Sequence, residues 1–230
     1  MTAADLITYY DDATGERTGL SAGELGGWAA ATAALLTEGC GLGRGDTAAV
    51  LLPPHWQTAA VLLGAWSAGL ELSIRGWATA GLEPAGDPLD VTFVHRSRIG
   101  SWLDDVPPGR YRFALGSAPH DVPDGYLDFA TAVRPRLGTP APQLRPDETL
   151  PATVDGTTYQ QYASVAAEVA ERNGIGPCDR VLVDTAVIEQ PVLWLLAPLT
   201  VGASIVLCAH LDESRLDERI TDERVTKILR

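Results

Sequence analysis

The hydrophobic pattern predicts one order of elements twice along the chain. Each copy consists of a helix, a glycine-rich connection, a buried strand, a second helix, a glycine and a second strand. The first strands are the apolar runs 47–52 and 180–185, and the second strands are 70–74 and 203–207. Strand–helix–strand units with right-handed crossovers form parallel sheets covered by helices. The pattern therefore predicts an α/β protein with parallel-rich sheets.

The two copies keep one register. Asp46 and Asp179 precede the first strand of each copy, and Gly69 and Gly202 end the helices that follow. The separation along the chain is the same for the two aspartates as for the two glycines. Because both pairs align without a gap, we interpret the copies as an internal repeat.

The helices that open the two copies have local signals at their ends. The first runs from about Ser21 to Glu38, and Ser21 with Glu24 forms a capping box. Its counterpart runs from about Tyr159 to Arg172. Four further elements are predicted between the copies: strands 91–94 and 111–115, and short helices 99–104 and 126–133.

A proline-rich stretch separates the two copies. Residues 134–146 contain four prolines, which is typical of a linker. We therefore predict a first subdomain over 1–133, a linker over 134–146 and a second subdomain over 147–230.

The charge balance argues against two classes of partner. Asp and Glu outnumber Lys and Arg by 30 to 17, and the formal net charge is −13. Nucleic acids and anionic membranes attract clustered basic residues, so we expect neither as a partner. The uncharged stretch 191–209 contains two prolines and a glycine, and we interpret it as a buried helix, a turn and a strand rather than a membrane span.

The cysteines and histidines predict neither disulfides nor a metal site. Cys40, Cys178 and Cys208 are far apart and odd in number, and the N-terminus lacks a basic region followed by an apolar stretch. This pattern predicts reduced thiols in a cytoplasmic protein. The four histidines are widely spaced without the pairing typical of metal ligands.

Seven segments carry a resemblance to a known family: 20–25, 43–46, 50–54, 65–69, 176–181, 195–203 and 216–229. They resemble the opening part of the adenylate-forming superfamily, which includes acyl-CoA synthetases, luciferases and nonribosomal adenylation domains. The resemblance is closest to a group of shortened actinobacterial relatives. It implies the fold of the N-terminal part of these enzymes, with two subdomains related by a pseudo-twofold axis.

The phosphate loop of that superfamily is altered here. The loop is rich in Ser, Thr and Gly, and at its place this chain has Asp155, Gly156, Thr157 and Thr158. One interpretation is a remnant whose amides and hydroxyls meet phosphate oxygens of a nucleotide. We favour the other, a two-stranded turn, because Asp-Gly is a strong hairpin signal and no lysine follows it.

Catalytic residues are not predicted. The sequence contains one lysine, Lys227. The resemblance implies that the ribose-binding aspartate and the C-terminal domain with the catalytic lysine would lie beyond position 230. Adenylate chemistry depends on positioned cations, so we expect no adenylation by this chain alone. We also expect no cofactor. The alternative is that the chain binds ATP or AMP.

A second candidate pocket lies after the first strand of each copy. His55 follows strand 47–52 through two prolines, and open α/β sheets bind ligands at the carboxyl ends of their strands. The corresponding region of the second copy holds Glu189 and Gln190. These polar residues either contribute to an acyl or nucleotide pocket or start helices, and we favour the helix starts.

Three functions fit these observations. We favour a truncated, non-catalytic binding or regulatory protein. The alternatives are a half-enzyme that adenylates a carboxylic acid with a partner supplying the C-terminal domain, and a structural dimerisation protein. The charges within 212–224 are interpreted as a solvated helix face. They cannot cover a sheet that ends at strand 225–229, so we expect a homodimer or another protein partner.

Overall fold

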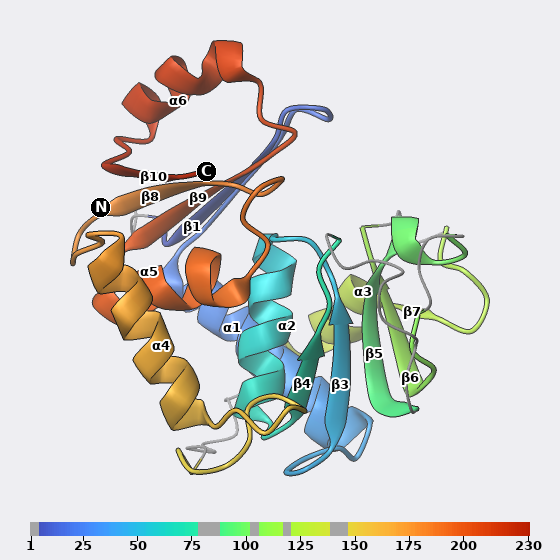
Figure 1. Cartoon of the computed structure of the whole chain (residues 1–230). Helices are drawn as coiled ribbons and strands as arrows, with labels where there is room; N and C mark the ends of the chain where they lie inside the picture. Colours follow the sequence, from blue (N-terminus) through green and yellow to red (C-terminus); the bar gives the residue numbers. More distant parts are fainter. Residues whose placement is uncertain (1–4, 78–87, 102–105, 117–120, 139–146) are drawn as a thin grey trace. The chain divides into compact units, whose positions relative to one another are not determined.

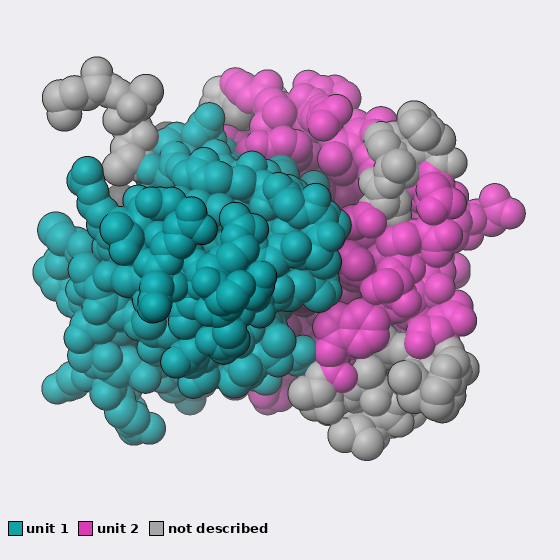
Figure 2. Space-filling view, turned by 90° about the horizontal axis from the view of Figure 1, so that it is seen from above, with its two compact units in different colours: residues 1–25, 54–59, 160–230 teal, residues 26–53, 60–159 magenta. Residues whose placement is uncertain are grey.

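The computed structural model describes residues 5–77, 88–101, 106–116, 121–138 and 147–230 (Figure 1). Two compact units make up the chain, as coloured in Figure 2. Unit 1 comprises residues 1–25, 54–59 and 160–230, and unit 2 comprises residues 26–53 and 60–159.

Unit 1 contains a five-stranded sheet in the order β10-β8-β9-β1-β2. Neighbouring strands are parallel except β1 and β2, which form an antiparallel hairpin. The strands are β1 (Ile7–Asp11), β2 (Glu16–Leu20), β8 (Arg180–Asp184), β9 (Ser204–Ala209) and β10 (Lys227–Leu229).

Helices cover both faces of this sheet. In Figure 1, α6 (Leu216–Asp222) lies on one face, and α4 (Tyr159–Arg172) and α5 (Ala197–Val201) lie on the other. Leu216 of α6 packs against Leu182 and Val206 of the central strands. Because β8 and β9 are covered on both sides, they read as continuous apolar runs instead of an alternating pattern. Short helical segments precede two of these helices: the π-helical segment η4 (Val192–Leu196) leads into α5, and the 3₁₀ turn η5 (Glu213–Arg215) leads into α6.

Unit 2 contains a parallel sheet in the order β4-β3-β5-β6-β7. Phe93 of β5 stacks on Phe113 of β6, with ring centres 5.4 Å apart, and meets Phe129 of α3 edge-on at 6.0 Å. The strands are β3 (Thr47–Leu51), β4 (Glu71–Ile74), β5 (Leu89–His95), β6 (Gly109–Leu115) and β7 (Leu127–Asp128), and α3 is Phe129–Val133. Three unit boundaries fall within helices, namely α1 (Ala22–Ala34), which continues into η1 (Leu35–Gly39), α2 (Trp56–Ser67) and the first turn of α4, and the fourth falls between β3 and α2.

The predicted α/β class with parallel-rich sheets is confirmed. The capping box is also present, because Ser21 N–H donates to the Glu24 carboxylate at 2.8 Å and Glu24 N–H donates to the Ser21 hydroxyl at 3.3 Å. The helix predicted over 159–172 is α4.

The two segments that align in the sequence also share local contacts. Asp46 and Asp179 each accept the N–H of the glycine three residues earlier at 2.7 Å. Gly69 and Gly202 end the helices in the left-handed conformation, with φ of 84° and 80°. In each segment the two strands pair in parallel. The internal repeat and its pseudo-twofold axis stay predictions.

Two short helices differ from the prediction. The helix expected over 99–104 is replaced by the 3₁₀ turn η2 (Arg96–Arg98), which the His95 side chain caps, and Ile99 is already extended. Residues 102–105 of that prediction lie outside the described residues. The helix expected over 126–133 begins only at Phe129, because Asp128 caps it by accepting the N–H of Thr131 at 2.7 Å.

The compact units do not follow the predicted division into 1–133 and 147–230. Strand β1 pairs in parallel with β9, so the N-terminal hairpin joins the sheet of the second copy. No local pattern specifies such long-range pairing. In the predicted linker 134–146, residues Arg134–Arg136 form a 3₁₀ turn, and 139–146 lie outside the described residues.

Candidate functional site

The segment at the place of the phosphate loop forms a turn in unit 2. Gly156, with φ of 88°, donates its N–H to the carbonyl of Thr153 at 3.0 Å, and Pro151 pairs with Thr158 in an antiparallel bridge. Val154 N–H donates to the carbonyl of Leu72 at 3.1 Å. The segment is therefore the two-stranded turn that Asp-Gly predicts, and it pairs with β4.

The carboxylate of Asp155 binds the donors of its own turn. Its Oδ1 accepts the hydroxyl of Thr153 at 2.6 Å and the N–H of Thr157 at 3.0 Å. These hydrogen bonds, that of Thr153 first, lower the pKa of Asp155. A phosphate at this place would compete with a carboxylate that is ionised at neutral pH, and it would be repelled by that charge.

His55 lies at the start of α2. Its carbonyl accepts the N–H of Ala59 at 3.0 Å, and its Nδ1 accepts the N–H of Gln57 at 3.1 Å. The imidazole also packs against the ring of Tyr9, with centres 4.2 Å apart. These contacts are those of a helix N-cap, as we favoured from the sequence.

Gln190 also begins a helix. Its carbonyl accepts the N–H groups of Leu193 and Trp194 at 2.9 and 3.2 Å, and its side chain is exposed. Glu189 precedes it and is half-buried. The alternative interpretation, a ligand pocket at His55, Glu189 and Gln190, stays a prediction.

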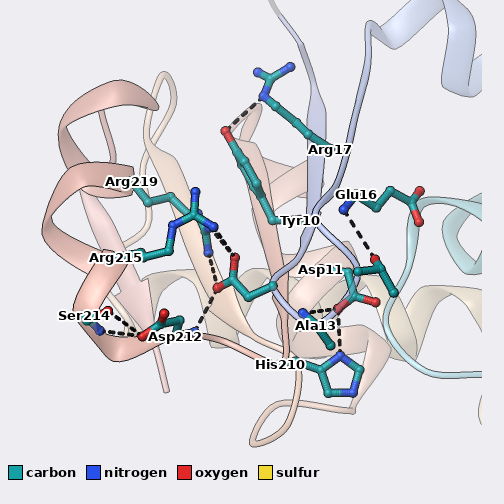
Figure 3. A network of polar contacts seen from close by, with 12 residues as sticks. Tyr10, Asp11, Ala13, Glu16, Arg17, His210, Asp212, Ser214, Arg215 and Arg219 are labelled. Carbon is teal, nitrogen blue, oxygen red and sulfur yellow. Dashed lines mark hydrogen bonds and ion pairs between the residues drawn. The ribbon is translucent and has the colours of Figure 1, made fainter.

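A network of charged side chains, not predicted from the sequence, ties α6 to the N-terminal hairpin (Figure 3). Asp12 accepts Arg219 at 2.6 and 3.0 Å, and the side chains of Asp12 and Arg219 are 5% and 3% exposed. Arg215 reaches the same carboxylate at 3.4 Å from an exposed position. The bond from Arg219 lowers the pKa of Asp12.

Glu223 forms the second centre of this network. It accepts the hydroxyl of Tyr10 at 2.5 Å and Arg17 at 2.9 Å, and it pairs with Arg180. Burial opposes ionisation of Glu223, but the hydrogen bonds from Tyr10, Arg180 and Arg17 outweigh it and lower its pKa to about 2. Both buried carboxylates thus have cationic partners, which is typical of a structural network.

A further polar contact lies at the surface end of the network. His210 Nδ1 lies 2.8 Å from the carboxylate of Asp11, and the histidine is exposed. The interpretation of 212–224 as a solvated face is wrong for Arg219 and Glu223, because the hairpin covers them. The sequence signal was the polar run Tyr10-Asp11-Asp12, which forms the carboxyl end of β1 and the first residue after it.

The described residues offer no metal site. They contain no group of three or more His, Cys, Asp or Glu residues that could hold an ion. None of the described helices is both long and apolar enough to cross a membrane.

Comparison with known proteins places the chain in a family. No family model matches it. A TIGR03089 family protein of Mycobacterium tuberculosis is 37% identical over 233 residues, covering 97% of this chain and 90% of that protein. The chain belongs to this family. It thus matches an actinobacterial relative, as the resemblance implied.

Solved structures show the fold of this TIGR03089 family protein to be that of the N-terminal domain of adenylate-forming enzymes. An acyl-CoA synthetase of Brucella canis has a TM-score of 0.73 at 18% identity, over 99% of this chain and 44% of that chain. MbtA of Mycobacterium smegmatis has a TM-score of 0.66 at 21% identity, over 98% and 45%. The N-terminal domain of FACL13 from Mycobacterium tuberculosis has a TM-score of 0.64 at 15% identity, over 97% and 58%. The chain therefore spans less than half of the first two proteins.

Proposed function

We propose that this TIGR03089 family protein is a non-catalytic binding or regulatory protein of the cytoplasm, built on the N-terminal fold of adenylate-forming enzymes. The observation that carries the proposal is the carboxylate of Asp155, which accepts Thr153 and Thr157 within its own turn. In a phosphate-binding loop, backbone N–H groups of this kind point at the phosphate. Here an anion of the protein already binds the N–H of Thr157 and the hydroxyl of Thr153.

The position of the single lysine also supports a non-catalytic role. The sequence has one lysine, Lys227, and it lies in β10 of unit 1, whereas the turn belongs to unit 2. Its charge acts on Asp179, which ends the loop before β8. Transfer of an adenylyl group develops negative charge that positioned cations must stabilise. In the sequence, this lysine is far from the turn, and no lysine follows Thr158 within the same segment.

The relative from Mycobacterium tuberculosis is itself short. Its match to this chain covers 90% of its length, whereas the Brucella canis acyl-CoA synthetase is covered to only 44%. That relative is therefore much shorter than an acyl-CoA synthetase.

The test is ATP–pyrophosphate exchange with a panel of carboxylic acids. We expect no exchange above the blank from the purified chain. Exchange that disappears in Thr157→Ala and Thr158→Ala, but persists in the control Thr14→Ala in the exposed β1–β2 turn, would contradict the proposal. Titration calorimetry with AMP, on the same samples, separates nucleotide binding from catalysis.

A half-enzyme is the second candidate, and the adenylate-forming fold favours it. In that case a partner protein would supply the C-terminal domain and its lysine. Exchange that appears only when a candidate partner is added would establish this function, and the chain would then retain an acyl or nucleotide pocket.

A structural role in dimerisation is the third candidate. Strand β10 lies at an edge of the unit 1 sheet, and Ile228 on it is 40% exposed. Exposed strand edges pair readily with other strands. Light scattering should give a dimer mass that falls to the monomer mass in Ile228→Lys. A monomer at all accessible concentrations would exclude self-association.

A further inference from the structure

A cavity of about 560 Å³ opens in unit 1 at the amino ends of its parallel strands. Its wall includes Leu6, directly before β1, and Arg180 and Ser204, the first residues of β8 and β9. Small-molecule sites in proteins have volumes of this order. Open α/β sheets usually bind their ligands at the carboxyl ends of the strands. This cavity lies at the other ends of the strands, their amino ends.

Two residues of the wall hold a backbone conformation that favours glycine. Cys178 has φ of 69° and Arg224 has φ of 54°, and both line the cavity. A side chain is costly in this conformation because its Cβ approaches the following carbonyl oxygen. At the position of the first copy that corresponds to Cys178, the chain has Gly45, with φ of 85°. The strained conformations therefore place two side chains at one cavity, as is common at functional sites.

The charges of the wall leave one cation available. Arg180 donates to Thr8 at 2.7 Å and to the carbonyl of Asp5 at 3.1 Å, and it pairs with Glu223. Arg224 is exposed, and its guanidinium has no hydrogen bond or ion pair with any described residue. A guanidinium without a partner offers two parallel N–H donors, which match the two oxygens of a carboxylate.

We propose that this cavity binds a small organic monocarboxylate, with the carboxylate on Arg224 and the apolar part against Leu6 and Ala22. The charged lining consists of two arginines and two acidic residues. Asp5 and Glu223 repel a dianion such as phosphate more strongly than a monoanion. The site shares no residue with the turn at Asp155, and the proposal does not depend on whether the chain adenylates a substrate.

Cys178 makes occupancy of the cavity measurable. It is exposed, whereas Cys40 and Cys208 are buried, so a thiol reagent should modify Cys178 first in the folded protein. Benzoate, added at constant ionic strength to the full chain, should slow this modification roughly tenfold at ten times its dissociation constant. Inorganic phosphate at the same concentration should give little protection.

Two variants test whether the guanidinium of Arg224 is responsible for the protection by benzoate. Arg224→Gly keeps the backbone conformation and should abolish protection by benzoate, whereas the control Arg172→Ala on the exposed face of α4 should retain it. Benzoate should also raise the melting temperature of the wild type and of Cys178→Gly, but not that of Arg224→Gly. Absence of protection in the wild type, equal protection by phosphate, or full protection in a folded Arg224→Gly would each overturn the proposal.

Discussion

The guanidinium of Arg219 lies over the ring of Tyr10, 4.2 Å from its centre. The same guanidinium binds the buried carboxylate of Asp12. One side chain of α6 thus contacts both the ring of a β1 residue and the carboxylate that directly follows β1. The helix is held to the N-terminal hairpin by charge as well as by packing.

Loss of Arg219 should be strongly destabilising. Arg219→Ala leaves Asp12 buried without its main partner, and the free energy of unfolding should fall by about 3–5 kcal/mol. Urea unfolding followed by circular dichroism measures the change. The matched control is Arg215→Ala, which removes a 52% exposed arginine at 3.4 Å from the same carboxylate and should cost less than about 1 kcal/mol. Equal losses in the two variants would show that Arg219 does not stabilise the buried charge.

Acid should weaken the fold through Glu223. Its pKa is lowered from 4.5 to about 2 in the folded protein, so its contribution is complete above pH 4.5 and is lost as the pH falls toward 2. This contribution is up to about 3 kcal/mol. Unfolding free energies of the wild type should fall across that interval more steeply than those of Glu223→Gln. The exposed Glu218→Gln should follow the wild type, and parallel curves for all three proteins would exclude Glu223 as the source.

Replacing Cys178 by glycine should stabilise the protein. The residue holds φ of 69°, and relief of this conformation should outweigh the added freedom of the unfolded chain by about 0.5–1 kcal/mol. The mirror experiment is Gly45→Ala, because a Cβ at Gly45 meets nothing within 4 Å and only the backbone strain remains. That variant should be destabilised by about 1 kcal/mol. Thermal unfolding of both variants checks whether Cys178→Gly raises the stability and Gly45→Ala lowers it.

The capping box of α1 should contribute measurably. Ser21→Ala removes the hydroxyl that accepts the N–H of Glu24, and the free energy of unfolding should fall by about 1 kcal/mol. Ser164→Ala, within the exposed part of α4, is the matched control and should change stability by less than about 0.5 kcal/mol. A loss of the same size in both variants would assign the effect to serine in general.

Features with a local signal were predicted from the sequence, and features that depend on distant pairing were not. Ser21 with Glu24 marks a helix start, and Gly69 and Gly202 mark helix ends, because capping and left-handed turns involve neighbouring residues. The pairing of Asp12 with Arg219 joins residues 207 positions apart, and no periodicity reports it. The same limit applies to the N-terminal hairpin, whose place beside β9 decides the composition of unit 1.

The candidate sites also differ in whether a local sequence signal predicts them. The turn at Asp155 was predicted because Asp-Gly acts within four residues. The cavity beside Arg224 was not, since its wall comes from both ends of the chain and from the starts of separate strands.

The carboxylate of Asp155 orders its turn without any bound ligand. A loop that becomes ordered only when phosphate binds has a conformation that depends on the concentration of nucleotide. The turn here carries its own anion, bonded to Thr153 and Thr157. We therefore expect this part of the fold to be equally ordered in energy-rich and starved cells, so that any signal the protein transmits has another origin than the level of ATP.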